Sequence, residues 1–64
     1  MADTGPEELA VLALVSRGLT VTAVARRLDV SERTVRRRLR TAADDLGVDS
    51  TIEAVVAAVR RRLI

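Results

Sequence analysis

Ser31-Glu-Arg-Thr-Val-Arg-Arg-Arg-Leu-Arg-Thr-Ala-Ala-Asp-Asp-Leu46 is the stretch that decides the fold. Ser31 suits a helix N-cap because its hydroxyl oxygen can accept a backbone N–H that has no partner in the first turn. Gly47 follows directly and is a typical stop signal, since glycine adopts the left-handed conformation at low cost. Apolar side chains recur along one side of such a helix, at Val35, Leu39, Ala42 and Leu46. The sequence therefore predicts an amphipathic helix over 31–46 whose other faces carry arginine.

Three further helices are predicted, so the expected fold is an all-α, compact four-helix domain. They span about residues 6–17, 21–28 and 51–62. Gly5 or Thr4 is expected to be the N-cap of the first of them, and Thr4 with Glu7 would form a capping box. A short helix, a tight turn over 29–31 and a longer basic helix make a helix-turn-helix. Because this turn has no glycine, Asp29 is expected to take its conformation. Residues 1–4 are expected to be a disordered tail and residues 5–64 the domain.

The fourth predicted helix has two apolar sides. Its inner stripe is expected to hold Ile52, Val55, Ala58, Val59 and Leu63. The outward side then holds Glu53, Val56, Ala57 and Arg60. An exposed apolar patch can be half of a symmetric contact, so this outward side is the predicted homodimer interface. Packing of its apolar side chains into the core is the alternative.

Basic residues are concentrated in one part of the chain. The formal net charge is only +2, but residues 26–40 contain seven Arg against one Asp and one Glu. Exposed arginine on a helix with an apolar back suits the major groove of DNA, because a guanidinium pairs well with guanine and with phosphate. The pattern therefore predicts double-stranded DNA as the partner.

The residue types that are absent exclude several other functions. The chain has no Cys, His, Lys or aromatic residue. A zinc site of the usual kind and an ordinary nucleophile–base pair both lack their residues, so no metal, cofactor or enzymatic activity is predicted. Single-strand and RNA binders usually stack bases on aromatic rings, which argues against them here. No apolar run is long enough to span a membrane, and a cytoplasmic protein is expected.

The order of these residues resembles the LuxR-type helix-turn-helix DNA-binding domain of bacterial transcription regulators. The resemblance covers about residues 5–64, nearly the whole chain. It rests on Glu8 with Val11-Leu12, Gly18-Leu19-Thr20, Val24-Ala25-x-x-Leu28, Val30-Ser31-x-x-Thr34-Val35-Arg36, Leu46-Gly47-Val48, and the end from Glu53-Ala54-Val55 to Leu63-Ile64. It implies a four-helix domain in which the third helix is the recognition helix and the fourth the dimerisation helix.

The resemblance also implies roles for single residues. Base contacts fall on the positions held here by Arg36, Arg37 and Arg40, and arginine pairs readily with guanine. Contacts with the DNA backbone fall on Thr20, Ser31 and Thr34. The charge pattern adds phosphate or solvent positions at Arg26, Arg27 and Arg33. Where the family usually has Lys before Leu-Gly-Val, this chain has Asp45, preceded by Asp44.

Three interpretations of function are open at this stage. The first is a sequence-specific duplex-DNA binder, either a bacterial transcription regulator or its excised C-terminal domain, with RNA polymerase as a further candidate partner. The second is region 4 of a sigma factor, which also fits Thr34-Val35-Arg36-x-Arg38-Leu39, although Leu46-Gly47-Val48 and a fourth helix favour the first. The third is a protein-interaction module with weak DNA binding, supported mainly by Asp44 and Asp45.

Overall fold

The computed structural model describes residues 4–64, and the tail predicted at the N-terminus lies outside them apart from Thr4. Four helices follow one another: α1 (Pro6–Ser16), α2 (Val21–Leu28), α3 (Glu32–Leu46) and α4 (Thr51–Arg60). No strand occurs among the described residues, which confirms the predicted all-α, four-helix fold. None of these helices is long and apolar enough to cross a membrane.

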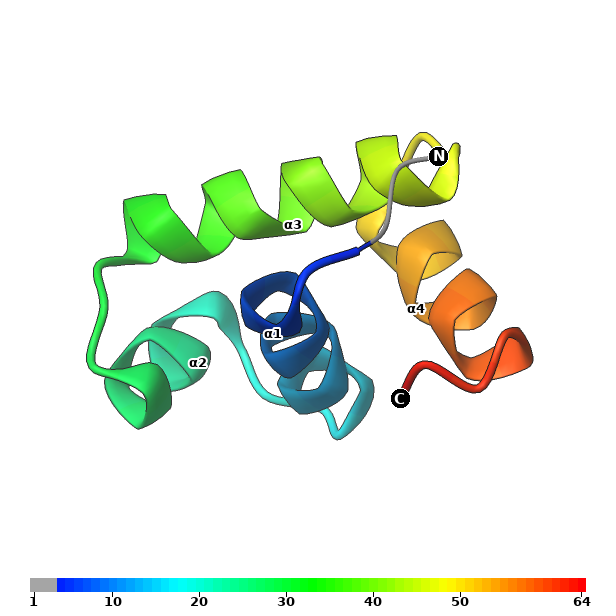
Figure 1. The fold of residues 1–64 in the computed structure, drawn as a ribbon. Coiled ribbons are helices and arrows are strands. Elements are labelled where there is room, and N and C mark those ends of the chain that lie inside the picture. Colours follow the sequence, from blue (N-terminus) through cyan, green and yellow to red (C-terminus); the bar gives the residue numbers. More distant parts are fainter. Residues whose placement is uncertain (1–3) are drawn as a thin grey trace.

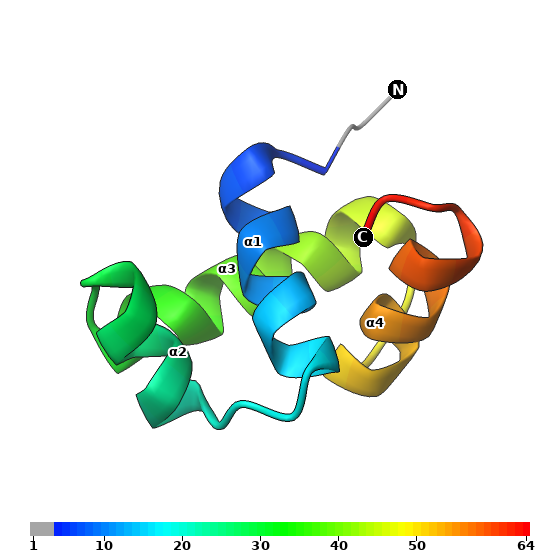
Figure 2. The same cartoon turned by 90° about the horizontal axis from the view of Figure 1, so that it is seen from below.

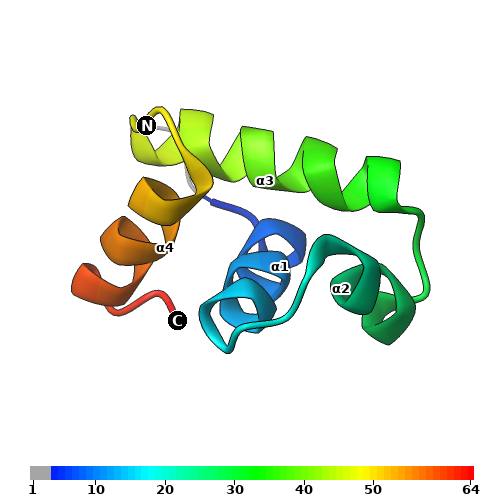
Figure 3. The same ribbon diagram turned by 180° about the vertical axis from the view of Figure 1, so that it is seen from behind.

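α3 is the longest helix and lies across the other three, as Figure 1 shows. α1 occupies the middle of the molecule and crosses α3 (Figure 2). In the described part of the chain, α2 and α4 lie on opposite sides of α1 and do not contact each other (Figure 3). All three shorter helices therefore pack on one side of α3, and the opposite side of α3 stays open.

The core is built from aliphatic side chains alone. Its buried members are Val11, Leu12 and Leu14 of α1, Val24 and Ala25 of α2, Val35, Leu39, Ala42, Ala43 and Leu46 of α3, and Ala54 and Ala58 of α4. The apolar stripe predicted for α3 is confirmed, and Ala43 widens it. Because burial of this stripe removes apolar surface from water, it fixes which side of α3 faces inward. No polar or charged residue is buried within the described residues.

All four helices are followed by one residue in the left-handed conformation. These residues are Gly18, Asp29, Gly47 and Arg62, with φ angles of 92°, 56°, 72° and 59°. After α2, the Val30 N–H donates to the Ala25 carbonyl at 3.0 Å, which satisfies an acceptor that the helix leaves without a partner. Asp29 thus adopts the conformation predicted for it. Aspartate enters this region more readily than most residues, so the turn into α3 forms without glycine.

The inner face of α4 differs from the prediction. Ile52, Val59 and Leu63 were expected inside, and they are 77%, 53% and 41% exposed. Ala58 is buried and Val55 partly buried as predicted, but the second fully buried residue is Ala54. α4 packs on α1 and α3, and small side chains at this contact let the helices approach closely. That close approach leaves Ile52, Val56 and Val59 on the outer side of α4.

A charged contact ties the start of α1 to the middle of α3. Arg38 Nη2 lies 3.4 Å from Glu7 Oε2, and the Arg38 side chain is only 19% exposed. Its Nε atom is buried without a hydrogen-bond partner, so the stem packs between the helices and only the tip is paired. Glu7 therefore does not make the capping box predicted with Thr4. Instead, Glu8 accepts the N–H of the N-cap residue Gly5 at 3.1 Å.

Truncation of a core side chain and truncation of a side chain on the outer side of α4 should have different effects on stability. Leu12→Ala should lower the free energy of unfolding by about 2–5 kcal/mol, because Leu12 is fully buried and its truncation leaves a cavity. Ile52→Ala, which also shortens a branched side chain, should change it by no more than about 0.5 kcal/mol, because Ile52 is 77% exposed. Urea and thermal unfolding followed by circular dichroism measure both. An equal loss for the two variants would contradict the orientation of α4.

Candidate nucleic-acid interface

α2, the turn and α3 form a helix-turn-helix whose two N-termini are capped by hydroxyl groups. Thr20 Oγ1 accepts the Ala23 N–H at 3.1 Å, and Ser31 Oγ accepts the Thr34 N–H at 3.0 Å. Ser31 Oγ also donates to Thr34 Oγ1 at 3.0 Å. A hydroxyl has one donor hydrogen, so Thr20, which only accepts within its cap, keeps its own for an external acceptor. In the Ser31–Thr34 pair either hydroxyl can supply the shared hydrogen, which leaves the other hydroxyl free to donate to an external acceptor. These caps fix the first turns of both helices at the surface.

The six arginines predicted to meet DNA all lie exposed on the α2–α3 unit. Arg26 and Arg27 lie in the last turn of α2, and Arg33, Arg36, Arg37 and Arg40 belong to α3. Helical spacing places Arg33, Arg37 and Arg40 on the side of α3 opposite the buried stripe. Arg36 lies on the neighbouring flank, toward α2. The structure therefore brings the three predicted base-contacting residues onto adjacent faces of α3, away from its buried stripe.

The flank of α3 that faces α2 carries a contact that sequence reasoning missed. Glu32 Oε1 lies 3.2 Å from Arg36 Nη2, one helical turn away. The other oxygen, Glu32 Oε2, accepts a hydrogen bond from Thr22 Oγ1 of α2 at 2.9 Å. The spacing of Glu32 and Arg36 is a readable sequence signal, since residues four apart share a helix face. The contact with Thr22 joins two helices and has no such signal.

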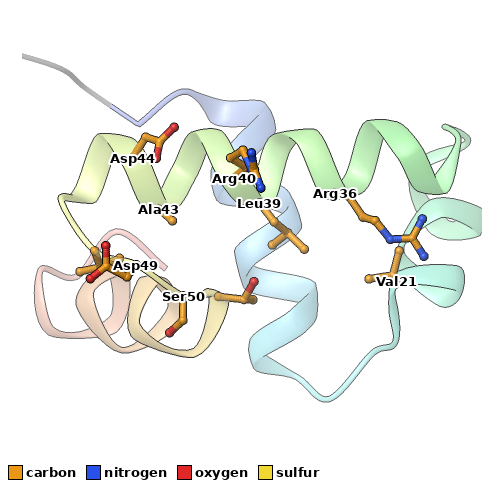
Figure 4. Close-up of a pocket in the computed structure, with 10 residues that line it drawn as sticks. Val21, Arg36, Leu39, Arg40, Ala43, Asp44, Asp49 and Ser50 are labelled. Carbon is orange, nitrogen blue, oxygen red and sulfur yellow. The ribbon is translucent and has the colours of Figure 1, made fainter.

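A shallow hollow of about 590 Å³ runs along this flank, between α3 and the starts of α2 and α4. Arg36 and Arg40 line one part of it, and Asp44 and Asp49 line another (Figure 4). Carboxylates repel phosphate, so the part lined by arginine is the part that suits a nucleic-acid backbone. Within residues 4–64, no three potential metal-ligating side chains come together in this hollow or elsewhere.

The four residues predicted for a dimer contact lie together on α4. Glu53, Val56, Ala57 and Arg60 line one small hollow of about 360 Å³, and Ile52 borders it as well. Val56 is 42% exposed, as its predicted outward position requires, whereas Ala57 is partly buried and packs against the core. Because Ile52 and Val59 are also exposed, the apolar surface of α4 is larger than the sequence analysis anticipated.

Comparison with known proteins agrees with this geometry. The model of the homeodomain-like domain family matches residues 6–52, nearly three quarters of the chain. The chain belongs to the homeodomain-like family. The matched residues run from the first residue of α1 into the first turn of α4 and include the whole helix-turn-helix. Helix-turn-helix units of this kind bind DNA, so this homeodomain-like chain is a DNA-binding domain of the type found in transcriptional regulators.

Two known proteins are similar to this homeodomain-like domain. It is 40% identical over 58 residues to the transcriptional regulatory protein YdfI of Bacillus subtilis strain 168, a match that covers 91% of this chain and 27% of YdfI. It is 33% identical to the response regulator ChrA of a heme-sensing two-component system. The crystal structure of ChrA matches with a TM-score of 0.91 over all of this chain and 32% of ChrA. The chain thus spans about a quarter to a third of the length of these relatives.

Proposed function

We propose that this domain binds duplex DNA in a sequence-specific manner by inserting α3 into the major groove. The observation that carries the proposal is the row of exposed arginines on the open side of α3, opposite the stripe that holds the helix on the core. A major groove admits one α-helix, and a guanidinium can pair with two acceptors on the edge of guanine. On this helix only the side that bears the arginines is free to enter a groove.

Each residue has its own part in the proposed complex. Bases are read by Arg36, Arg37 and Arg40. Phosphates are contacted by Thr20, Arg26, Arg27, Ser31, Arg33 and Thr34. The phosphate contacts set the position of α3 and most of the salt dependence, whereas the base contacts set the preferred sequence. Asp44 lies further along the exposed side of α3, and its charge limits close contact with DNA to the first three turns of the helix.

The domain is proposed to be of the LuxR type and to act in bacterial transcription, in the cytoplasm. The fourth helix supports this subtype over region 4 of a sigma factor, because α4 begins two residues after Leu46-Gly47-Val48 and packs on both α1 and α3. The likeness to a transcriptional regulatory protein and to a response regulator supports the same choice. A regulator of this kind would carry the domain as one part of a longer chain.

A homodimer through α4 is the second part of the proposal. Glu53 and Arg60 have opposite charges and flank the apolar pair Val56 and Ala57 around one hollow. A two-fold axis through this surface would set the apolar side chains of two copies against each other and would allow each acidic residue to face the basic residue of the other copy. Two copies related in this way would present their α3 helices to two half-sites of DNA.

Substitution of single arginines tests how α3 reads DNA. Arg37→Ala should weaken binding to the preferred duplex by about 1–3 kcal/mol and should relax the preference at one base position. Arg26→Ala removes the same side chain from α2 and is the matched control, because it should weaken binding evenly on all sequences and flatten the dependence on salt. Fluorescence anisotropy titrations with the preferred duplex and its single-base variants measure both effects. An even loss on all duplexes for Arg37→Ala would contradict base reading by this residue.

A charge placed in the α4 hollow tests the homodimer. Val56→Glu should shift the chain toward the monomer, because a carboxylate in a contact between apolar surfaces loses hydration without gaining a partner. Thr41→Glu adds the same charge to an exposed position of α3 and should leave the association unchanged. Sedimentation equilibrium over a wide range of concentrations measures the effect. A parent chain that remains monomeric at every concentration would remove the support for this contact.

A further inference from the structure

We propose that Glu32 is a positioning residue that fixes the guanidinium of Arg36 for base reading and ties it to α2. This inference rests on the proposed function, in which Arg36 contacts a base. It adds a specificity-determining carboxylate to the part of α3 that carries the exposed arginines. The contact at stake joins three side chains from the two helices of the helix-turn-helix: Thr22, Glu32 and Arg36.

The geometry gives each oxygen of Glu32 a separate partner. Oε2 is held by the hydroxyl of Thr22 at 2.9 Å, and Oε1 holds Nη2 of Arg36 at 3.2 Å. Glu32 is also the first residue of α3 and follows the N-cap residue Ser31, so the cap fixes the backbone of Glu32. A carboxylate anchored at both its backbone and one oxygen has little freedom to follow a mobile arginine. Arg36 therefore adapts to Glu32 rather than the reverse.

Arg36 can still bind DNA while it is paired with Glu32. Its side chain is 65% exposed, and only one of its five N–H donors is used by Glu32. Guanine offers two acceptors on one edge, which a guanidinium pairs with through two parallel donors. A guanidinium held on one side by a carboxylate loses less conformational freedom on binding than one on an unrestrained side chain. The ion pair with Glu32 thus favours one direction in which Arg36 can approach DNA. It also favours a base over a nearby phosphate as the partner of Arg36.

Arg36 differs in this respect from its neighbours on α3. Within residues 4–64 the ion pairs of α3 involve Arg36 and Arg38, and Arg38 is directed to α1. Arg37 and Arg40 have exposed side chains with no carboxylate within ion-pair distance in the same range. Of the three arginines proposed to read bases, Arg36 is the one with a fixed orientation before DNA is bound. Its base position should accordingly be the most sharply discriminated.

The test compares how strongly each variant discriminates between bases at each position of the duplex. A merely structural role for Glu32 would not lower discrimination at one position alone. Binding of the 64-residue chain is measured by fluorescence anisotropy at fixed salt, on its selected duplex and on all single-base variants of that duplex. Arg36→Ala first identifies the base pair that Arg36 reads, where discrimination should fall about tenfold or more. Glu32→Gln should lower discrimination at the same base pair by about two- to fivefold and leave the other positions unchanged. In the double variant with Arg36→Ala, Glu32→Gln should cause no further loss of discrimination at this base pair.

Asp44→Asn is the matched control for the loss of one negative charge from α3. Asp44 is exposed and lies about 18 Å along the helix axis from Glu32. This variant should tighten binding to all duplexes alike and leave discrimination unchanged. Thr22→Val is a second test, since it keeps the shape of the side chain but releases Oε2, and it should lower discrimination at the Arg36 base pair in the same direction as Glu32→Gln.

The outcomes separate this inference from the proposed function. If Glu32→Gln behaves like Asp44→Asn, tightening binding evenly with no change of discrimination, Glu32 acts only as a charge and the inference is overturned while base reading by Arg36 stands. If Arg36→Ala changes no base preference, base reading by Arg36 fails and the inference falls with it. Loss of discrimination at one shared base pair in Arg36→Ala, Glu32→Gln and Thr22→Val supports the positioning role.

Discussion

The packing of the apolar stripe of α3 across α1 is the contact on which the rest of the structure depends. Val35 and Leu39 are buried together with Val11 and Leu12, and no aromatic residue enlarges this core. Once that stripe is buried, every other position of α3 has a fixed direction. Arg38 falls at the edge of the contact and turns toward Glu7 of α1. The remaining arginines of α3 are left exposed, which is why one packing contact determines both the fold and the position of the surface proposed to meet DNA.

Most features that depend on local chemistry could be predicted from the sequence, whereas features that depend on the approach of two helices could not. The caps at Thr20 and Ser31, the left-handed Asp29 and the stop at Gly47 each follow from the preferences of a few adjacent residues. The inner face of α4 was predicted wrongly because large apolar side chains were expected inside. Close packing placed the small Ala54 inside with the predicted Ala58, and left Ile52 and Val59 exposed. The hydrogen bond from Thr22 to Glu32 depends on the angle between α2 and α3, which cannot be predicted from residue spacing in the sequence.

Charge is distributed along α3 so that its two ends offer different surfaces. The first three turns carry the exposed arginines, and Asp44 and Asp45 follow in the last turn, near the acidic Asp49. A basic surface with no acidic residues at its ends would bind any phosphate backbone. The carboxylates at one end, and Glu32 at the other, restrict where a duplex can lie. This asymmetry supports the proposal of a defined pose on DNA over general attraction to nucleic acid.

Selection of binding sites from a random duplex library with the purified chain tests the central claim most directly. The account predicts enrichment of a short motif containing guanine, recovered in two-fold related copies whose spacing matches successive major-groove faces of the duplex. Retention of all sequences alike, lost evenly as salt is raised, would contradict it. That result would mean that the arginines of α3 bind phosphate without reading bases.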